Sequence, residues 1–258
     1  MSDTETGLQR RVGSVRHAAA ILRHLEGIGI GQGVNPIARA LDISPSSCFN
    51  LLKTLADEQL VDFDSETKLY SLGPGAIALG RRALDPHGAF ELVRQRLEVL
   101  ADRHHITVSL WRPRRGDQFA LIGYCESAAA FRIHLTVGQR LPSAAGAGGR
   151  CMMAFSGLDD AAIRRRMEAV KWAEAPDPDA YLRDIAAARA QGWAIDVGQF
   201  VKGMTTIAVP AFNGSTIEFL VMGTMFTGQF EAAQLDVIAE DLAATGKWLS
   251  ARLFGPAS

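Results

Sequence analysis

Cysteine is scarce in this chain of 258 residues, which has three scattered cysteines, Cys48, Cys125 and Cys151. So few thiols at such spacings exclude a disulfide framework and a cysteine-based zinc site. We therefore expect no metal and no cofactor, and a reducing cytosol suits this cysteine usage.

Long hydrophobic runs are also lacking. No stretch approaches the roughly 20 apolar residues that span a bilayer, and the polar segment 1–11 has no apolar core of a signal peptide. We expect a cytoplasmic protein that does not enter a membrane, with residues 1–11 as a flexible tail. The composition, 48% hydrophobic and 21% charged, is typical of a globular protein.

A basic excess, which marks many nucleic-acid-binding proteins, is absent as well. The chain has 27 Lys and Arg against 28 Asp and Glu, and its net charge is -1. The first 84 residues hold nine basic residues, matched by nine acidic ones. Any DNA binding must therefore depend on where polar and charged residues lie, and not on their number.

Residues 12–75 carry a pattern of three helices. The spacing of apolar residues predicts helices over 15–26, with Ser14 as N-cap, over 36–41, and from Pro45 onward. The glycine-alternating stretch 27–33 predicts a flexible turn between the first two. The last two helices are joined by a very short turn, which is the outline of a helix-turn-helix.

The third helix is followed by a predicted β-hairpin over 61–72, whose polar tip would form a wing. In the helix itself, Phe49, Leu52 and Leu55, or Leu51 and Leu55, are expected to face inward. Residues 12–75 are therefore predicted to form a winged helix-turn-helix, with residues 76–85 as a linker helix after it.

Residues 86–258 alternate between strand and helix patterns. A long amphipathic helix over 87–104 precedes three predicted strands, the third at 131–137. Helices, three more strands and a final helix over 230–253 follow. Groups of strands separated by groups of helices predict an α+β domain with a mostly antiparallel sheet and flanking helices, suited to binding a small molecule.

This order of parts resembles the IclR family of bacterial transcriptional regulators, from Val12 to Leu253. The segments that carry the resemblance are 14–22, 37–43, 46–47, 51–55 and 70–73 in the first part, and 138–150, 192–196, 203 and 207–210 in the second. The resemblance implies a GAF-like effector domain. It also implies a dimer, or a dimer of dimers, that binds a palindromic operator in double-stranded DNA and either represses or activates transcription.

Five polar residues of the third helix are candidates for contact with bases: Ser46, Ser47, Asn50, Lys53 and Thr54. An asparagine amide pairs with adenine, and hydroxyls bond base edges or phosphates. Family members usually have an arginine at position 50, so Asn50 favours either contacts with A·T pairs or a weaker complex. Phosphate contacts are expected from Arg16, Arg39, Lys53 and Lys68, with Arg10 and Arg11 as a minor-groove arm. The alternative is that these are ordinary solvated charges.

The resemblance also implies an effector pocket made of Ala147, Gly148, Asp196, Met204, Thr206, Gly223 and Met225. Family members that bind small oxo-acids have serines where this chain has Gly223 and Met225, while Thr224 is expected to point the other way. We therefore expect a larger and less polar pocket, which suits an aromatic or other bulky apolar acid. Trp111 and Phe131 either line this pocket or pack in the core.

Two other functions are alternatives to regulation. An enzyme could use Cys125 or Cys151 with His104 or His105, but the sequence has no Gly-x-Ser-x-Gly, His-Glu-x-x-His or P-loop motif, and no enzyme is predicted. A winged-helix protein that associates with other proteins, without sequence-specific DNA binding, is the remaining alternative. Steep loss of DNA affinity with salt would separate the two, because phosphate contacts release counterions.

Overall fold

The computed structural model describes residues 12–128, 133 and 135–255 and divides the chain into two compact units, Met1–Ala83 and Leu84–Ser258. The predicted tail 1–11, with Arg10 and Arg11, lies outside the described residues, and so does Phe131. Among the helices that are described, none has the length and apolar character needed to cross a bilayer.

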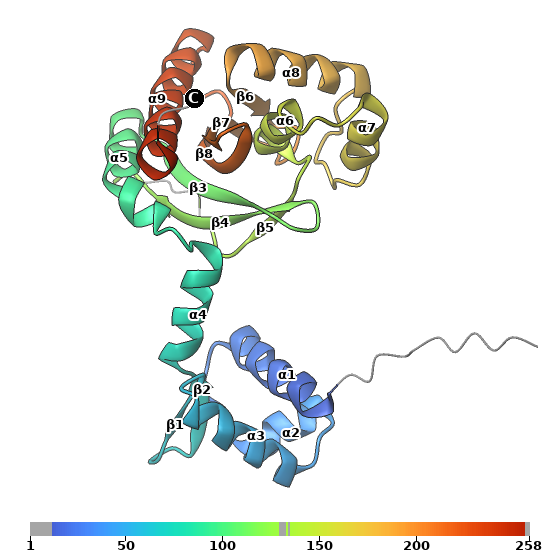
Figure 1. The fold of residues 1–258 in the computed structure, drawn as a ribbon, viewed down its shortest axis with the longest axis vertical. Helices are drawn as coiled ribbons and strands as arrows, with labels where there is room; N and C mark the ends of the chain where they lie inside the picture. The colour runs from blue at the N-terminus through green and yellow to red at the C-terminus, as the bar shows by residue number, and fades with distance from the viewer. Residues whose placement is uncertain (1–11, 129–132, 134, 256–258) are drawn as a thin grey trace, which may run out of the picture. The chain divides into compact units, whose positions relative to one another are not determined.

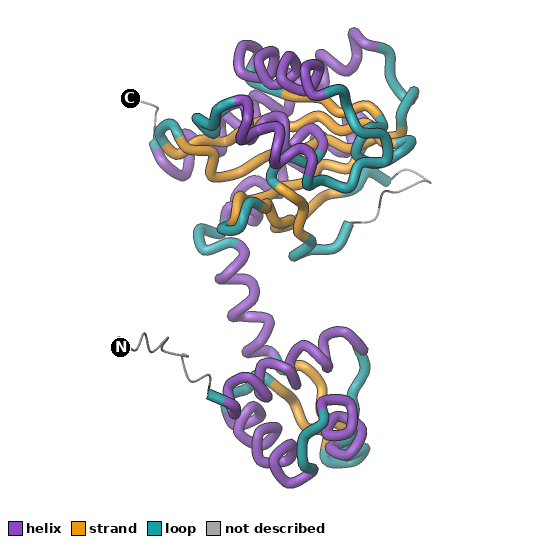
Figure 2. The backbone as a smooth tube through the Cα atoms, turned by 90° about the vertical axis from the view of Figure 1, so that its right-hand side faces the viewer, coloured by secondary structure: helices purple, strands orange, loops and turns teal. Residues whose placement is uncertain are grey.

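The first unit contains helices and one β-hairpin (Figures 1 and 2). In chain order they are α1 Gly13–Ile28, α2 Val34–Leu41, α3 Pro45–Asp57, β1 Val61–Asp64, β2 Leu69–Leu72 and α4 Pro74–Leu84. Strands β1 and β2 pair in antiparallel register, with Phe63 opposite Tyr70. Helix α4 begins at Pro74, ahead of the predicted start at residue 76, because proline fits the first turn of a helix.

The core of this unit fixes the angle between α2 and α3. Ile21 and Leu25 of α1, Ile37 of α2 and Leu52 of α3 are buried together. The turn between α2 and α3 passes through Asp42, whose φ of 52° ends α2 in the left-handed region. Ser44 then caps α3 by accepting the Ser47 N–H at 3.1 Å.

Two local predictions in this unit were wrong, and a third was incomplete. Helix α1 is preceded by Val12 at its N-cap, and Ser14 lies inside the helix. The stretch 27–33 is not simply a flexible turn, because Gln32 exchanges backbone hydrogen bonds of 2.9 and 2.8 Å with Tyr70 of the wing. In α3 the inward residues are Cys48, Leu52 and Leu55, and Phe49 is exposed.

The second unit is built on an antiparallel sheet, which confirms the predicted α+β class. Within the described residues six strands lie in the order β5-β4-β3-β8-β7-β6. Their bounds are β3 Thr107–Arg114, β4 Gln118–Cys125, β5 Arg140–Pro142, β6 Ala194–Val197, β7 Met204–Asn213 and β8 Thr216–Phe226. The strand predicted at 131–137 was wrong, since the described residues there are loop and turn and the edge strand is β5.

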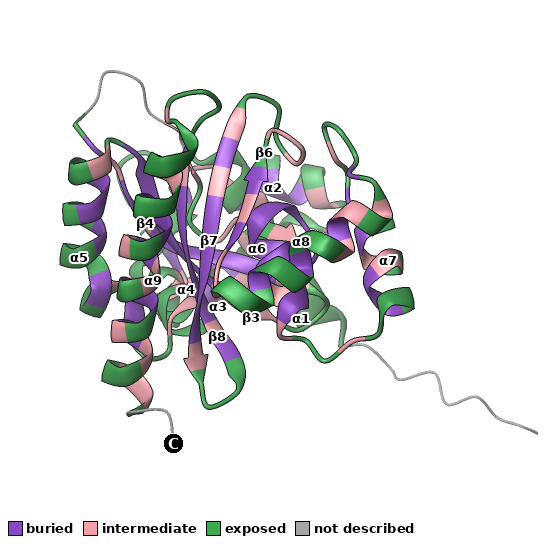
Figure 3. Cartoon of the chain, turned by 90° about the horizontal axis from the view of Figure 1, so that it is seen from above, coloured by how far each residue is buried: buried purple, intermediate pink, exposed green. Residues whose placement is uncertain are grey.

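Helices cover both faces of this sheet (Figure 1). One face carries α5 Ala89–His104 and α9 Ala232–Phe254, and the other carries α6 Gly146–Ala154, α7 Asp160–Glu168 and α8 Pro178–Gln191. Buried residues of α5 and α9 line the sides of these helices that face the sheet, while exposed residues face away (Figure 3). This is the amphipathic pattern that the sequence predicts for both helices.

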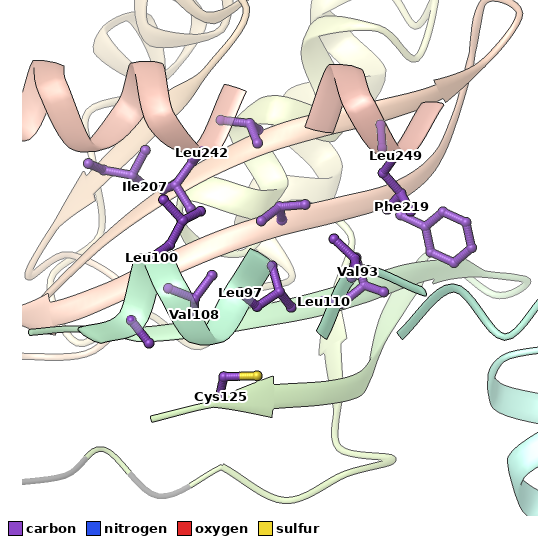
Figure 4. Packing of buried hydrophobic residues seen from close by; sticks show 14 of the residues in the cluster. Val93, Leu97, Leu100, Val108, Leu110, Cys125, Ile207, Phe219, Leu242 and Leu249 are labelled. Carbon is purple, nitrogen blue, oxygen red and sulfur yellow. The ribbon is translucent and has the colours of Figure 1, made fainter. Parts of the chain in front are cut away.

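The face under α5 and α9 is filled with apolar side chains (Figure 4). Leu97 of α5 and Leu249 of α9 pack with Leu110 and Phe219 of the sheet, and all four are buried. Met225 of β8 belongs to the same cluster. Side chains alternate along a strand, so the neighbours of Met225 on β8 point to the opposite face.

Candidate nucleic-acid interface and ligand cavity

The exposed surface of α3 brings together the residues predicted to contact bases. Ser46, Asn50 and Lys53 recur at helical spacing and are all exposed, on the side opposite the buried Cys48 and Leu52. Ser47 and Thr54 are also exposed. The arrangement gives α3 a largely polar surface from Ser46 to Thr54.

Hydrogen bonds within the unit hold some of these side chains in place. The Ser44 hydroxyl donates to the Ser47 hydroxyl at 2.8 Å and lies 3.2 Å from that of Ser46. The Thr54 hydroxyl donates to the Asn50 carbonyl at 3.0 Å. The hydroxyls of this surface are therefore held by hydrogen bonds to nearby residues. Asn50 and Lys53 are the longer polar side chains beside them.

Phe49 is the surface residue that sequence reasoning missed. Its side chain is 48% exposed, although a phenylalanine was expected to serve the core. The available signal was the small apolar Cys48, because positions 48, 52 and 55 recur at the helical period and define the inward side without Phe49.

The wing carries more negative than positive charge. Asp64 accepts hydrogen bonds from the Thr67 hydroxyl at 2.7 Å and from the Glu66 and Thr67 N–H groups at 2.8 and 3.3 Å. These bonds lower the pKa of Asp64, so its carboxylate stays ionised. Lys68 is the one basic residue of the hairpin, and its ammonium lies 5.9 Å from the centre of the Phe63 ring.

The remaining predicted phosphate contacts lie on other helices. Arg16 is exposed on α1, and Arg39 is exposed in the last turn of α2. The structure therefore groups the base-contact candidates on α3 and distributes the phosphate-contact candidates over α1, α2 and the wing. The phosphates of DNA lie along a long backbone, which several elements of a protein can contact at once. This distribution therefore suits phosphate binding.

A cavity of about 250 Å³ lies on the α6 face of the sheet in the second unit. Its walls come from the sheet, from the first turn of α6, and from the loops before β5 and after β6. The sheet contributes Trp111, Phe119, Leu141, Asp196, Met204, Thr206, Met222 and Thr224, and the other elements contribute Ile133, Leu135, Gln139, Ala145, Gly146, Ala147, Gly148, Phe200 and Val201.

Most of the predicted pocket residues line this cavity. Those in place are Trp111, Ala147, Gly148, Asp196, Met204 and Thr206. Gly223 and Met225 were placed on the wrong face: a methyl group built at Gly223 would lie 2.9 Å from Leu242 of α9 and 3.0 Å from Ile106. Because strand side chains alternate, the β8 residues in the cavity are Met222 and Thr224.

Asp196 lies at the cavity wall but is already paired. Its Oδ1 accepts a hydrogen bond from Arg150 at 2.9 Å, and its Oδ2 accepts the Phe200 N–H at 3.1 Å. The residue is 4% exposed. Asp196 therefore neutralises a buried cation and holds the loop that contributes Phe200 to the cavity.

Arg150 of α6 is a second residue that sequence reasoning did not select, and it organises this region. It is 1% exposed and donates to Asp184 at 3.0 Å, to the Gly146 carbonyl at 3.2 Å and to the Gln199 side chain. A buried guanidinium needs this number of partners, because its five N–H groups have left water. The sequence signal was an arginine inside an otherwise small and apolar helix.

The first turn of α6 forms part of the cavity wall. Residues 145–148 line it, and no side chain caps this end of the helix. A methyl group at Gly148 would overlap Met222, so glycine lets α6 approach the sheet this closely. The first N–H groups of a helix have no partner within the helix, and together with the helix dipole they favour an anionic group near such an end.

Of the residues considered for catalysis, the two cysteines are in environments that disfavour their reactive form. Burial raises the pKa of Cys125 to about 11 and also raises the pKa of Cys151, which disfavours both thiolates. The His104 Nε2 lies 2.8 Å from an Asp241 carboxylate oxygen, in a contact between α5 and α9. Among the described residues, no group of His, Cys, Asp and Glu could hold a metal ion.

Comparison with known proteins agrees with this geometry. A regulator from Paracoccus denitrificans, the HTH-type transcriptional regulator BhcR, is 27% identical over 210 residues, or 78% of this chain and 74% of that protein. The crystal structure of an IclR transcriptional regulator from Alicyclobacillus acidocaldarius is 27% identical and covers 95% of this chain and 100% of its own, with a TM-score of 0.74. An IclR homologue from Microbacterium hydrocarbonoxydans, complexed with 4-hydroxybenzoate, shares the fold at 15% identity, with a TM-score of 0.75 over 93% of this chain and 98% of its own.

Two family models also match. The model described as bacterial transcriptional regulator IclR C-terminal matches residues 81–251, and the IclR helix-turn-helix domain matches residues 14–65. The proteins that carry these domains are regulators and not enzymes, so the matches support the predicted function. The chain belongs to the IclR family of bacterial transcriptional regulators and is a DNA-binding protein.

Proposed function

We propose that this protein regulates a catabolic operon in response to a small monocyclic organic acid. The observation that carries the proposal is the cavity itself, with apolar walls, two threonine hydroxyls and an uncapped helix N-terminus at one end. Its volume of about 250 Å³ lies just below the range of about 300–1,000 Å³ for ligand pockets. A single ring with a carboxylate suits that size.

The cavity wall supports a defined orientation of such an acid. The carboxylate would accept hydrogen bonds from the N–H groups of the first turn of α6, where the helix dipole is favourable. The ring would pack on Trp111, Phe119 and Met222, and Thr206 and Thr224 would bond a ring substituent. Asp196 repels this anion little, because Arg150 neutralises its charge. The acid 4-hydroxybenzoate, bound by the Microbacterium homologue, belongs to this chemical class.

The effector site can be tested by titrating the protein with 4-hydroxybenzoate and with its methyl ester while following tryptophan fluorescence. The acid should bind at least about tenfold more tightly than the ester, because the ester leaves the N–H groups of α6 without an anion. Thr224→Val should weaken binding of the acid. Met225→Leu, on the other face of β8, is the matched control and should leave it unchanged. Equal binding of acid and ester would refute the carboxylate site.

On the DNA side, α3 would enter the major groove with Asn50, Lys53, Ser46, Ser47 and Thr54 toward the bases, while Arg16, Arg39 and Lys68 contact phosphates. The proposed assembly is a dimer or a dimer of dimers in the cytoplasm, bound to a palindromic operator whose half-sites are about 34 Å apart. Effector binding would change operator affinity by about 5- to 150-fold.

The DNA-binding function is tested by selecting bound sequences from a random pool of double-stranded DNA at two salt concentrations. Enrichment of a palindromic site whose affinity falls steeply with salt supports operator binding through phosphates and bases. If folded protein enriches no site, the winged helix serves protein association instead. The selected site can then be used to measure how a candidate effector changes operator affinity.

A further inference from the structure

Phe49 is a large apolar side chain on the polar surface of α3. It is 48% exposed and lies one helical turn from both Ser46 and Lys53. The ring is therefore a neighbour of the side chains that are candidates for base contact. A single exposed apolar residue needs no explanation by itself, so its meaning depends on what surrounds it.

The core of the first unit has no room for the Phe49 side chain. The inward side of α3 is occupied by Cys48, Leu52 and Leu55, and the Cys48 thiol donates to the Val34 carbonyl of α2 at 3.7 Å. Turning Phe49 inward would require a rotation of α3 that expels these buried residues. The exposed ring is thus fixed by the packing between α2 and α3.

The surface around Phe49 is poor in positive charge. Lys53 is the one basic residue of α3, and the wing contributes Asp62, Asp64 and Glu66 against Lys68. A recognition helix with one cation gains little from phosphates. Contacts with base edges must then provide more of the affinity. An aromatic ring can make an apolar contact of this kind.

We propose that Phe49 contacts the C5 methyl group of a thymine in the major groove while Asn50 pairs with an adenine. The proposal rests on the proposed DNA-binding function and names the bases that α3 selects. Consecutive residues of a helix point in directions about 100° apart, so Phe49 and Asn50 would contact neighbouring base pairs. Thymine is the base that presents a methyl group in this groove.

The test replaces each thymine of the selected operator by uracil, one position at a time, in wild-type protein and in Phe49→Ala. Uracil keeps the base pair and loses the methyl group. At one position in each half-site, wild-type affinity should fall roughly fourfold, which is the factor expected for one buried methyl group. In Phe49→Ala the same replacement should change affinity less than about twofold, because the partner of the methyl group is gone. Phe49→Leu should retain part of the effect.

Lys53→Ala is the control, since loss of a phosphate or base contact elsewhere should leave the thymine-to-uracil penalty as it is in wild type. The proposal is overturned if no thymine shows the penalty in wild type, or if Phe49→Ala keeps it. A Phe49→Ala variant that keeps the penalty but changes oligomeric state would assign the ring to an interface between copies. If wild-type protein selects no DNA at all, the proposed function fails together with this inference, and that outcome is distinguishable from the others.

Discussion

The two faces of the sheet in the second unit are built differently. The face under α5 and α9 is a continuous apolar core, whereas the face under α6 contains a cavity, a buried ion pair and two threonines. Adjacent residues of β8 take part in both, with Met225 in the core and Thr224 in the cavity. One face thus stabilises the fold, and the other holds the space and the polar groups of the proposed ligand site.

The largest effect should come from breaking the ion pair on the cavity face. Arg150→Ala leaves the Asp196 carboxylate buried without its partner, and we expect the free energy of unfolding to fall by about 3–5 kcal/mol. Urea denaturation measures this loss. The paired variant Arg150→Met with Asp196→Asn should recover part of it, because no buried charge is left unpaired. No recovery would mean that packing of the guanidinium, and not its charge, is what matters.

A cavity made on the opposite face should lower the free energy of unfolding by nearly as much, but it should leave ligand binding intact. Leu97→Ala removes a fully buried side chain of α5, and we expect a loss of about 2–5 kcal/mol in the free energy of unfolding. Affinity for 4-hydroxybenzoate, measured under conditions where the variant is folded, should be unchanged. Leu92→Ala, in an exposed position of the same helix, is the matched control. A large change in affinity would show that the two faces are coupled.

Two glycine-to-alanine substitutions, one on each face of the sheet, test whether the faces serve stability and ligand binding separately. Gly223→Ala presses on Leu242 and Ile106, so it should lower the free energy of unfolding by about 1–3 kcal/mol without affecting the ligand. Gly148→Ala displaces Met222 into the cavity and should lower ligand affinity about tenfold or more. Calorimetric titration and thermal unfolding of both variants make the comparison. Identical behaviour of the pair would contradict the assignment of the two faces.

The smallest effect concerns the contact between α5 and α9. Burial raises the pKa of Asp241, but hydrogen bonds from His104 and Arg103 lower it by more, so it lies below its usual value. A lowered carboxyl pKa stabilises the folded state above the unfolded value of about 4, and this contribution is lost as the pH falls through the folded value. Asp241→Asn should therefore lower stability at pH 7 by on the order of 1 kcal/mol or less. The difference from wild type should shrink in acid, as unfolding measured between pH 7 and pH 3 would reveal.

Much of the fold could be predicted because it depends on local patterns. Helical periodicity located α1, α2 and α3, and the polar tip at residues 64–68 located the wing. The strand predicted at 131–137 failed because a short apolar segment is equally compatible with a loop packed on the sheet. The edge strand β5 is only Arg140–Pro142, which is too short to show an alternating pattern.

The site was harder to predict because its details depend on which way side chains point. The cavity residues contributed by α6, β6 and β7 were identified, while a one-residue error in the direction of β8 exchanged Met222 and Thr224 for Gly223 and Met225. Every residue of a strand changes face with such an error. Arg150 could not be identified, because its partners lie at Asp184, Asp196 and Gln199, far along the chain.

The acidic wing affects how the protein would search DNA for its proposed operator. Affinity for random DNA comes almost entirely from phosphate neutralisation, and the hairpin offers Lys68 against three acidic side chains. A bacterial chromosome presents on the order of 10⁶ or more competing sites. Weak binding to those sites leaves a larger share of the molecules free in solution at any moment. A small number of copies would then occupy the proposed operator, and a correspondingly small amount of the proposed effector would change the occupancy.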